Sequence, residues 1–280
     1  MRLSHNMAAL NIYKEYSKVL TKQFNSLDKI SSGIKVNKAK DNPNSLAQSE
    51  KLRMQIRGLQ MASNNVQDGC SMLQTAEGGL QEITSMLQRI RELVVQAGSG
   101  SNNVSNKVTI QNEINEMAKG VDNISASTES NGVNLLNDAT NTSLDIAVGA
   151  NVGEKIQIPR FNLVSQGQLN LSDASGNSLM DIRSQTGVEA AFNTIDAALS
   201  LVLSARSQYG ALENRFESSL SNLSEIIDKT EGADSKLRDT DMAEEIVEYS
   251  KSNILVEAGN AMMAQANKLP QDILRILDKR

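Results

Sequence analysis

Apolar residues recur every seven positions from Leu52 to Val94, and this repeat predicts the longest helix of the chain. The repeat positions are Leu52, Leu59, Val66, Leu73, Leu80, Leu87 and Val94. A seven-residue apolar repeat lines one side of an α-helix and calls for a partner helix along that side. At about 1.5 Å per residue, this stretch would extend for roughly 65 Å. We expect one long helix from about Ser45 to Ala97.

Two further helical patterns supply partners for this long helix. Apolar residues step by three or four positions through residues 110–124 and again through 191–226, which is the spacing of one helix face. Gly98-Ser99-Gly100-Ser101 ends the long helix, so the next helix folds back antiparallel and the three form a bundle. We expect Glu231-Gly232-Ala233-Asp234 to end the third helix.

The long helix contains a glycine pair, Gly78-Gly79, in its middle. Each glycine costs a helix about 1 kcal/mol relative to alanine. Two explanations are open at this point: the pair is a flexure point, or a neighbouring element approaches the helix closely there.

Between residues 131 and 158 the apolar period changes to two. Apolar residues there alternate with mostly polar or small ones: Val133, Leu135, Leu144, Ile146, Val148, Ile156 and Ile158. Asn131-Gly132 and Gly153 supply turns, so the pattern predicts one or two β-hairpins. We place a small β-region at about 131–185, of which residues 160–186 have weak strand or loop character.

Each end of the chain carries an amphipathic helix. Residues 3–30 place apolar side chains at steps of three or four, and Ser31-Ser32-Gly33 is a C-cap sequence. A polar joint with the turn signal Asp41-Asn42-Pro43 follows. Asp241 and Glu244 form a capping box for the last helix, and Pro270 should kink or break that helix.

The last helix repeats apolar residues at Met242, Tyr249, Val256 and Met263. The second position of the predicted seam holds Ile246, Asn253, Asn260, Asn267 and Leu274. Asparagine in a helix seam weakens pairing but fixes its register. Two helices that pair only with each other leave apolar stripes uncovered, and such stripes mark interaction surfaces. The pattern therefore predicts self-association through the ends of the chain.

The charge distribution also brings the two ends together. Residues 1–51 hold nine Lys/Arg and four Asp/Glu, whereas residues 225–250 hold three Lys/Arg and nine Asp/Glu. Opposite fields favour pairing of these segments. The net charge of −5 argues against nucleic acid as a partner.

These patterns predict a mainly α fold, built as a long helical coiled coil or bundle with a small β-hairpin region. Aromatic residues make up 3% of the chain and there are three prolines, a composition typical of long helices. We expect two domains. Residues 1–44 and 232–280 form one, in which the terminal helices pair as a separate coiled coil, and residues 45–231 form the helical bundle.

The sequence offers no set of residues for catalysis or metal binding. His5 is the single histidine and Cys70 the single cysteine, so neither a two-histidine metal site nor a cysteine metal cluster can be assembled in one chain. We expect no enzymatic activity, cofactor or metal. Residues 1–20 lack the apolar core of a signal peptide, and no uninterrupted apolar run has the length of a membrane span.

Several ordered motifs resemble those of bacterial flagellins. Near the amino terminus these are Met1-Arg2-Leu3-Ser4-His5-Asn6, Leu27-Asp28-Lys29-Ile30-Ser31-Ser32-Gly33, Ala39-Lys40-Asp41-Asn42-Pro43, Asn64-Asn65-Val66-Gln67-Asp68-Gly69 and Gln88-Arg89-Ile90-Arg91-Glu92-Leu93. Asn131-Gly132-Val133-Asn134-Leu135-Leu136 is similar to the entry to the family's β-region. At the other end they are Asp241-Met242-Ala243-Glu244-Glu245 and Ala261-Met262-Met263-Ala264-Gln265-Ala266-Asn267. The resemblance covers about residues 1–136 and 186–277.

The resemblance implies an extracellular subunit of the flagellar filament used for motility. It implies a homopolymer in a helical filament, with the terminal helices as an inner tube and the bundle outside it. It also implies export of the unfolded chain by the flagellar type III apparatus and an export chaperone on the carboxyl-terminal helix. Filament cap and hook-junction proteins and a host Toll-like receptor are further implied partners. The segment from 137 to 185 is short, so the resemblance implies a short form without the large outer domains of many flagellins.

The resemblance also assigns roles to individual positions. Gln88, Arg89, Leu93 and Glu113 match family positions that contact a Toll-like receptor and also lie in subunit packing, and both roles are open for this chain. For polymerisation, the stripes of the terminal helices point to Leu3, Met7, Leu10, Ile246, Tyr249, Val256 and Met263.

Two alternatives remain beside a filament subunit. A hook–filament junction protein has similar terminal helices but would not elongate on filament seeds. A soluble coiled-coil adaptor would bind its partner through the long helices and form a small oligomer of fixed size.

Overall fold

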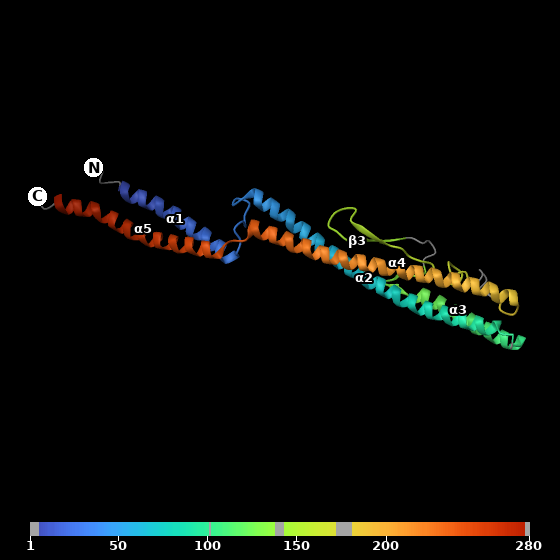
Figure 1. The fold of residues 1–280 in the computed structure, drawn as a ribbon. Coiled ribbons are helices and arrows are strands. Elements are labelled where there is room, and N and C mark those ends of the chain that lie inside the picture. Colours follow the sequence, from blue (N-terminus) through green and yellow to red (C-terminus); the bar gives the residue numbers. More distant parts are fainter. Residues whose placement is uncertain (1–5, 101, 138–142, 172–180, 278–280) are drawn as a thin grey trace. The chain divides into compact units, whose positions relative to one another are not determined.

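The computed structural model describes residues 6–100, 102–137, 143–171 and 181–277, with side chains described as far as residue 268. These residues form five α-helices and two small antiparallel strand pairs (Figure 1). The mainly α fold with a small β-region is therefore confirmed. The described chain divides into two compact units, residues 1–54 with 229–280 and residues 55–228, and each unit is considered by itself.

Helix α1 (Met7–Ser32) and helix α5 (Met242–Leu277) pair along their lengths in the first unit. The Asn6 side chain caps α1 by accepting from the Ala9 N–H at 3.1 Å, and Gly33 ends it at a φ of 71°. The predicted N-cap of α5 is confirmed, because the Asp241 carboxylate accepts from the Ala243 and Glu244 N–H groups. Helix α5 continues through Pro270, so a break at that residue is wrong, and the alternative of a kink there stays a prediction.

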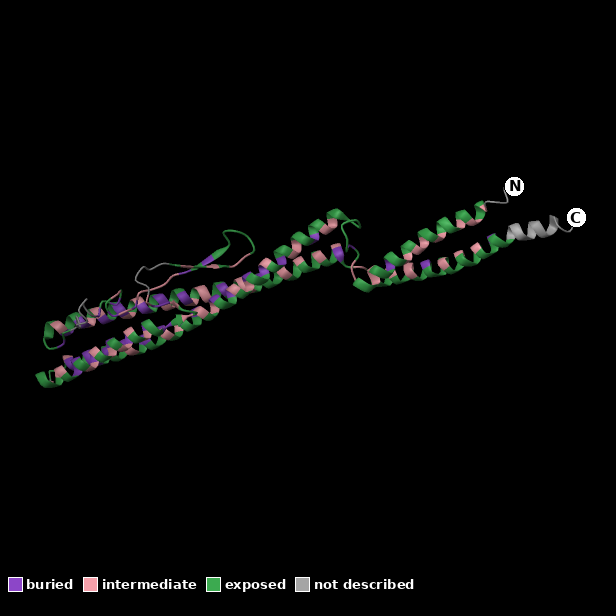
Figure 2. Cartoon of the chain, turned by 180° about the vertical axis from the view of Figure 1, so that it is seen from behind, coloured by how far each residue is buried: buried purple, intermediate pink, exposed green. Residues whose placement is uncertain are grey.

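Helices α2 (Pro43–Gly98), α3 (Val104–Ser127) and α4 (Gln185–Arg238) supply the bundle. The predicted heptad lies in its core from Leu59 onward, and Val66, Leu80, Leu87 and Val94 have no exposed surface, whereas Leu52 is half-buried and belongs to the first unit. Ile114 and Val121 of α3 and a stripe on α4 join the same cluster, which includes Ile195, Ala198, Val202, Ala205, Tyr209 and Phe216. Buried residues concentrate in this bundle, whereas α1 and α5 are mostly exposed or half-buried (Figure 2).

The β-region packs on the bundle as two short hairpins joined by irregular chain. Strands β1 (Glu129–Ser130) and β2 (Val133–Asn134) form a hairpin, and Asn131 and Gly132 take positive φ angles in its turn. Strands β3 (Leu144–Ala147) and β4 (Lys155–Ile158) form a second hairpin, so the predicted hairpins are confirmed. Several side chains of this region are fully buried in the bundle cluster, namely Leu135, Leu136, Ile158, Leu163 and Leu171.

Helix α4 does not end at residues 231–234, so that prediction is wrong, and it continues to Arg238. A polar network inside the first unit holds its end. Asp234 accepts from the Ser49 hydroxyl at 2.5 Å and from Arg53 at 3.1 Å, and Arg238 donates to Glu50 at 3.0 Å. Ser49 is 1% exposed, so its bond to Asp234 is shielded from water and helps to offset the cost of Gly232.

One window of α4 has the length and composition of a membrane-spanning segment, with a mean hydropathy of 1.3. A third of that window is buried, and the apolar stripe of α4 lies in the bundle core. A core helix of a bundle therefore accounts for its apolar composition.

Candidate assembly surface

The α1–α5 pair is built on small residues, which allows the two helices to approach closely. On α5, Ser252 and Ala266 are 2% and 4% exposed, and on α1, Ser26 is 4% exposed. Gly259 lies midway between Ser252 and Ala266 in the seven-residue repeat of α5. A Cβ placed on Gly259 would lie 3.1 Å from the ring of Tyr16. This face of α5 has no room for a larger side chain at Gly259.

Polar contacts fix the register of the pair. The Asn6 side chain donates to the Ala266 carbonyl at 2.8 Å, and Gln23 donates to Asn253 at 3.1 Å. At the other end of the pair, Lys29 lies 3.4 Å from Glu245, whose side chain is 13% exposed. This pairing agrees with the opposite charges of the two ends of the chain.

The predicted position of the asparagines in the seam is wrong, although Asn253 does make a polar contact with α1 through Gln23. Asn253 and Asn260 are exposed, and Ser252 and Gly259, one position earlier, occupy the pairing face. The reason is steric, because closely spaced helices favour small side chains where they touch. The apolar repeat alone did not show which positions of α5 face α1. A signal was present in the sequence, because Ser252, Gly259 and Ala266 are small residues spaced by seven.

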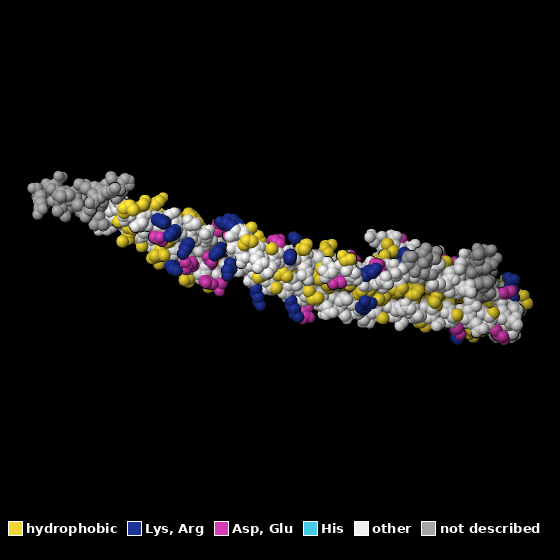
Figure 3. Space-filling view, turned by 90° about the horizontal axis from the view of Figure 1, so that it is seen from above, with side chains coloured by type: hydrophobic (Ala, Val, Ile, Leu, Met, Phe, Trp, Pro, Cys, Tyr) yellow, Lys and Arg dark blue, Asp and Glu magenta, His cyan; other side chains and the backbone are white. Residues whose placement is uncertain are grey.

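Pairing of α1 with α5 leaves large apolar side chains of both helices uncovered. On α1 these are Met7 (63% exposed), Leu10 (59%), Tyr13 (59%), Phe24 (58%) and Leu27 (45%). On α5 they are Met242, Ile246, Val247, Ile254, Leu255 and Met262, each at least 41% exposed. Apolar side chains gather on this part of the surface (Figure 3). We call these residues the terminal apolar surface.

An open apolar groove lies within this surface, between α1 and α5. It is lined by Ile12, Tyr16 and Val19 from α1 and by Leu255, Ala258, Gly259 and Met262 from α5, with Asn11 and Glu15 at its edge. Glu15 bonds to Lys18 at 2.6 Å, and that bond lowers the pKa of the Glu15 carboxyl.

The residues predicted for polymerisation divide into two groups. Met7, Leu10 and Ile246 lie on the terminal apolar surface. Tyr249, Val256 and Met263 are half-buried on α5, at the spacing of the small residues that face α1. Leu3 lies outside the described residues.

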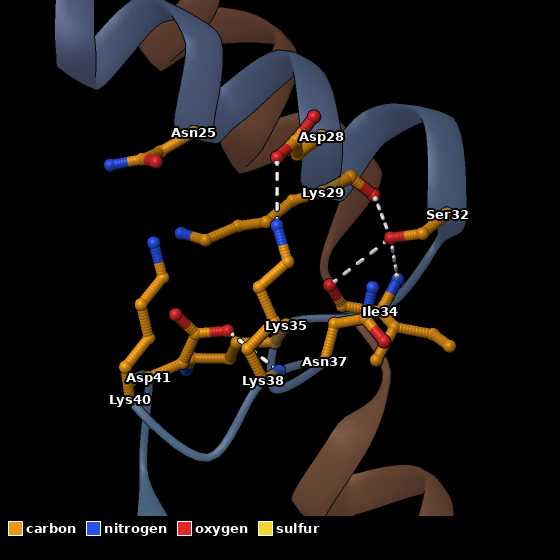
Figure 4. A pocket seen from close by; sticks show the side chains of 10 residues that line it. All are labelled: Asn25, Asp28, Lys29, Ser32, Ile34, Lys35, Asn37, Lys38, Lys40 and Asp41. Carbon is orange, nitrogen blue, oxygen red and sulfur yellow. Dashed lines mark hydrogen bonds and ion pairs between the residues drawn. The ribbon is translucent and has the colours of Figure 1, made fainter.

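A lysine-rich hollow follows α1 at the joint between α1 and α2 (Figure 4). Lys38 lies 3.6 Å from Asp28, and its backbone N–H donates to Asp41 at 3.0 Å. Lys35 and Lys40 line the same hollow. The Lys35 N–H donates to the Arg238 carbonyl at 2.6 Å, which ties the joint to the end of α4.

Only part of the predicted receptor-contact cluster of Gln88, Arg89, Leu93 and Glu113 lies on the surface. Gln88 and Arg89 are exposed, and Arg89 lies 3.1 Å from Glu92 and 3.0 Å from Glu113 of α3. Hydrogen bonds to Glu113 and then Glu92 raise the pKa of the Arg89 guanidinium. Leu93 is 1% exposed, so it packs beneath this surface and does not form part of it. Sequence reasoning did not include Glu92.

Among the described residues, no group of three or more His, Cys, Asp or Glu side chains could hold a metal ion. Cys70 is half-buried beside the core, and burial raises the pKa of its thiol, which disfavours the reactive thiolate. His5 lies outside the described residues.

The fold and this surface define a helical structural protein whose two terminal helices pair and leave large apolar side chains exposed. Family models for the bacterial flagellin N-terminal and C-terminal helical regions match residues 3–142 and 192–277. The chain belongs to the bacterial flagellin family. It is accordingly a subunit of the flagellar filament, which is extracellular.

Full-length relatives agree with this assignment. The chain is 38% identical to a flagellin of Halalkalibacterium halodurans over 277 residues, covering 99% of this chain and 100% of the relative. It is 39% identical to a flagellin of Bacillus subtilis over 306 residues and 35% identical to a flagellin of Treponema pallidum over 288, with the same coverage. The end-to-end match with the first relative agrees with a short form that lacks large outer domains.

Solved structures support the fold. Bacillus cereus flagellin matches with a TM-score of 0.50 at 24% identity, over 57% of this chain and 88% of that one. A putative flagellar hook-associated protein of Vibrio parahaemolyticus matches with a TM-score of 0.60 at 14% identity, over 71% of this chain and 100% of that one.

Proposed function

We propose that the terminal apolar surface joins neighbouring subunits in the filament. Residues 1–44 and 232–280 then form the inner tube and residues 45–231 the outer bundle. The observation that carries this proposal is that Met7, Leu10, Tyr13, Phe24 and Leu27 are each at least 45% exposed beside a pairing face of small residues. Water-exposed apolar area of this kind gains about 25 cal/mol per Å² when it is covered.

Folding and polymerisation are coupled in this mechanism. Ordering one residue costs about 1–2 kcal/mol of backbone entropy, and α1 and α5 bury few large side chains against each other. Contacts with neighbouring copies supply the additional burial that offsets this cost. Tyr249, Val256 and Met263 act inside the subunit, whereas Met7, Leu10 and Ile246 act between subunits.

Truncation tests this assignment. Deleting residues 1–30 or 250–280 should leave the circular dichroism of the bundle helical and abolish elongation on filament seeds. Filaments formed by either truncated chain would contradict the proposal. Elongation of the full chain on seeds also separates a filament subunit from a hook–filament junction protein, which would cap a seed without extending it, and from an adaptor of fixed oligomeric size.

The terminal apolar surface must be shielded from water and from other subunits before assembly. We propose that an export chaperone covers the apolar side chains of α5, including Val247, Ile254 and Met262, while the type III apparatus holds the chain for export. The filament cap and the hook-junction proteins are the remaining partners at the two ends of the filament. The protein has no enzymatic role in this scheme.

Gln88, Arg89 and Glu113 are proposed as a surface for a host Toll-like receptor, with Leu93 supporting it from below. The exposure of Gln88 and the bridge from Arg89 to Glu113 support this role. Arg89→Ala should weaken receptor activation more than tenfold while filaments still elongate. If Arg89→Ala instead abolishes elongation and leaves activation intact, the cluster serves filament packing.

A further inference from the structure

Methionine is unevenly exposed along this chain. Met7, Met262 and Met242 of the terminal apolar surface are 63%, 57% and 41% exposed, and on α2, Met54 and Met61 are 65% and 60% exposed. By contrast, Met263 is half-buried on α5, and Met86 is half-buried against the bundle core. Thioethers react with peroxide according to their accessibility, so adjacent residues of α5 differ in their expected reactivity.

We propose that Met7 and Met262 are oxidation sites that control whether a free subunit can join the filament. This inference rests on the proposed role of the terminal apolar surface. The reaction transfers one oxygen atom from hydrogen peroxide to the methionine sulfur. The O–O bond breaks, an S–O bond forms, the sulfur is oxidised by two electrons to the sulfoxide and the peroxide is reduced to water.

The surroundings of both sulfurs make this change costly on assembly. Met262 lines the α1–α5 groove beside Leu255, Ala258 and Gly259, where Asn11 and Glu15 are the polar residues. Met7 precedes Leu10 and Tyr13 on the uncovered stripe of α1. A sulfoxide is strongly polar, and its oxygen must lose its water when a neighbouring subunit covers these apolar residues. The oxidised subunit is therefore excluded from the lattice.

A competition experiment tests this without altering the sequence. Full-length monomer is treated with limiting hydrogen peroxide, the peroxide is removed with catalase, and the mixture is elongated on seeds. Filaments are then separated from unassembled protein, and peptide mass spectrometry measures the sulfoxide fraction at each methionine. We expect sulfoxide at Met7 and Met262 to be at least tenfold depleted in filaments, and sulfoxide at Met54 and Met61 to be equal in the two fractions.

Variants provide a second measurement. Met7→Leu/Met242→Leu/Met262→Leu removes the three exposed methionines of the terminal apolar surface, keeps the apolar volume and should elongate after peroxide treatment within twofold of its untreated rate. The matched control Met54→Leu/Met61→Leu replaces two similarly exposed methionines of α2 and keeps those of the terminal apolar surface. After peroxide treatment it should lose elongation as the natural chain does. Treatment with methionine sulfoxide reductases of both stereospecificities should restore elongation of the oxidised natural chain.

Two outcomes would overturn the inference. One is equal sulfoxide fractions at Met7 and Met262 in filaments and in unassembled protein. The other is depletion of sulfoxide at Met54 and Met61 to the same extent as at Met7 and Met262. Failure of the untreated chain to elongate on seeds would instead refute the proposed function, so the two failures are distinguishable.

Discussion

Two adjacent glycines of α2 have different surroundings, and this decides between flexure and close approach at that site. A Cβ on Gly79 would lie 2.6 Å from the Thr128 hydroxyl and 3.0 Å from a methyl of Leu136. A Cβ on Gly78 would have no neighbour within 4 Å. Close approach of the chain after α3 therefore explains Gly79, and it does not explain Gly78.

Replacing Gly78 or Gly79 by alanine should change the free energy of unfolding in opposite directions. Gly79→Ala should lower the free energy of unfolding of the bundle by about 1–2 kcal/mol, because overpacking exceeds the gain in helix propensity. Gly78→Ala should raise it by about 0.5–1 kcal/mol. Urea denaturation followed by circular dichroism measures both. Equal effects of the two variants would show that local packing does not distinguish these positions.

Tyr209 provides a pH-dependent prediction. Its hydroxyl donates to the Pro159 carbonyl at 2.9 Å, its ring contacts Phe161 edge to face, and it is 1% exposed. Burial raises its pKa far above the ordinary value of 10.0. A raised folded-state pKa means that the neutral form is favoured by folding, so stability is complete below pH 10 and falls as the pH rises above that value.

Urea midpoints measured between pH 8.5 and pH 11 test this dependence. We expect the natural chain to lose stability across the upper part of that range and Tyr209→Phe to lose less, although the variant starts about 1 kcal/mol less stable for want of the hydrogen bond. Parallel pH profiles of the two chains would assign the alkaline loss to other groups.

At the scale of elements, the end of α4 depends on a side-chain network rather than on helix propensity. Asp234→Ala removes the acceptor of the buried Ser49 hydroxyl and of Arg53. Because Arg53 is 42% exposed, its share is small, and the buried hydroxyl dominates the expected loss of about 1–2 kcal/mol. Amide hydrogen exchange should accelerate in residues 231–238. Glu231→Ala, at an exposed position of the same segment, is the matched control and should leave exchange unchanged.

Elements that depend on apolar periodicity could be predicted from the sequence, and those that depend on side chains distant in the sequence could not. The heptad from Leu52 to Val94 and the stripe on α4 were predictable because large apolar residues at helical spacing fill one core. The continuation of α4 past Gly232 was not, since it depends on Ser49 and Arg53, which lie far away in the sequence. The partner positions on α5 were missed because a close helix pair selects small residues, which an apolar pattern does not detect. Leu93 was placed on a surface by resemblance although its apolar side chain fits the core.

At the scale of the whole molecule, the two units differ in what stabilises them. The buried residues in the described part of the first unit are mostly small or polar, namely Ser26, Val36, Ser49, Arg238, Ser252 and Ala266. The second unit holds the continuous cluster of Leu, Ile, Val and aromatic side chains. Apolar burial scales with stability, so the first unit should open at a lower free energy than the second.

Hydrogen exchange of the free subunit and of the filament tests this difference. In the dilute monomer, amides of α1 and α5 should exchange at least a hundredfold faster than those of α2 between Leu73 and Val94. In the filament, protection of α1 and α5 should rise to approach that of the bundle, because neighbouring copies then cover Met7, Leu10 and their neighbours. The bundle amides serve as the internal control, since their core is complete in one subunit and should change little. Equal protection of α1 and α5 in the two states would mean that the pair is already stable alone, and the terminal apolar surface would then have no part in ordering it.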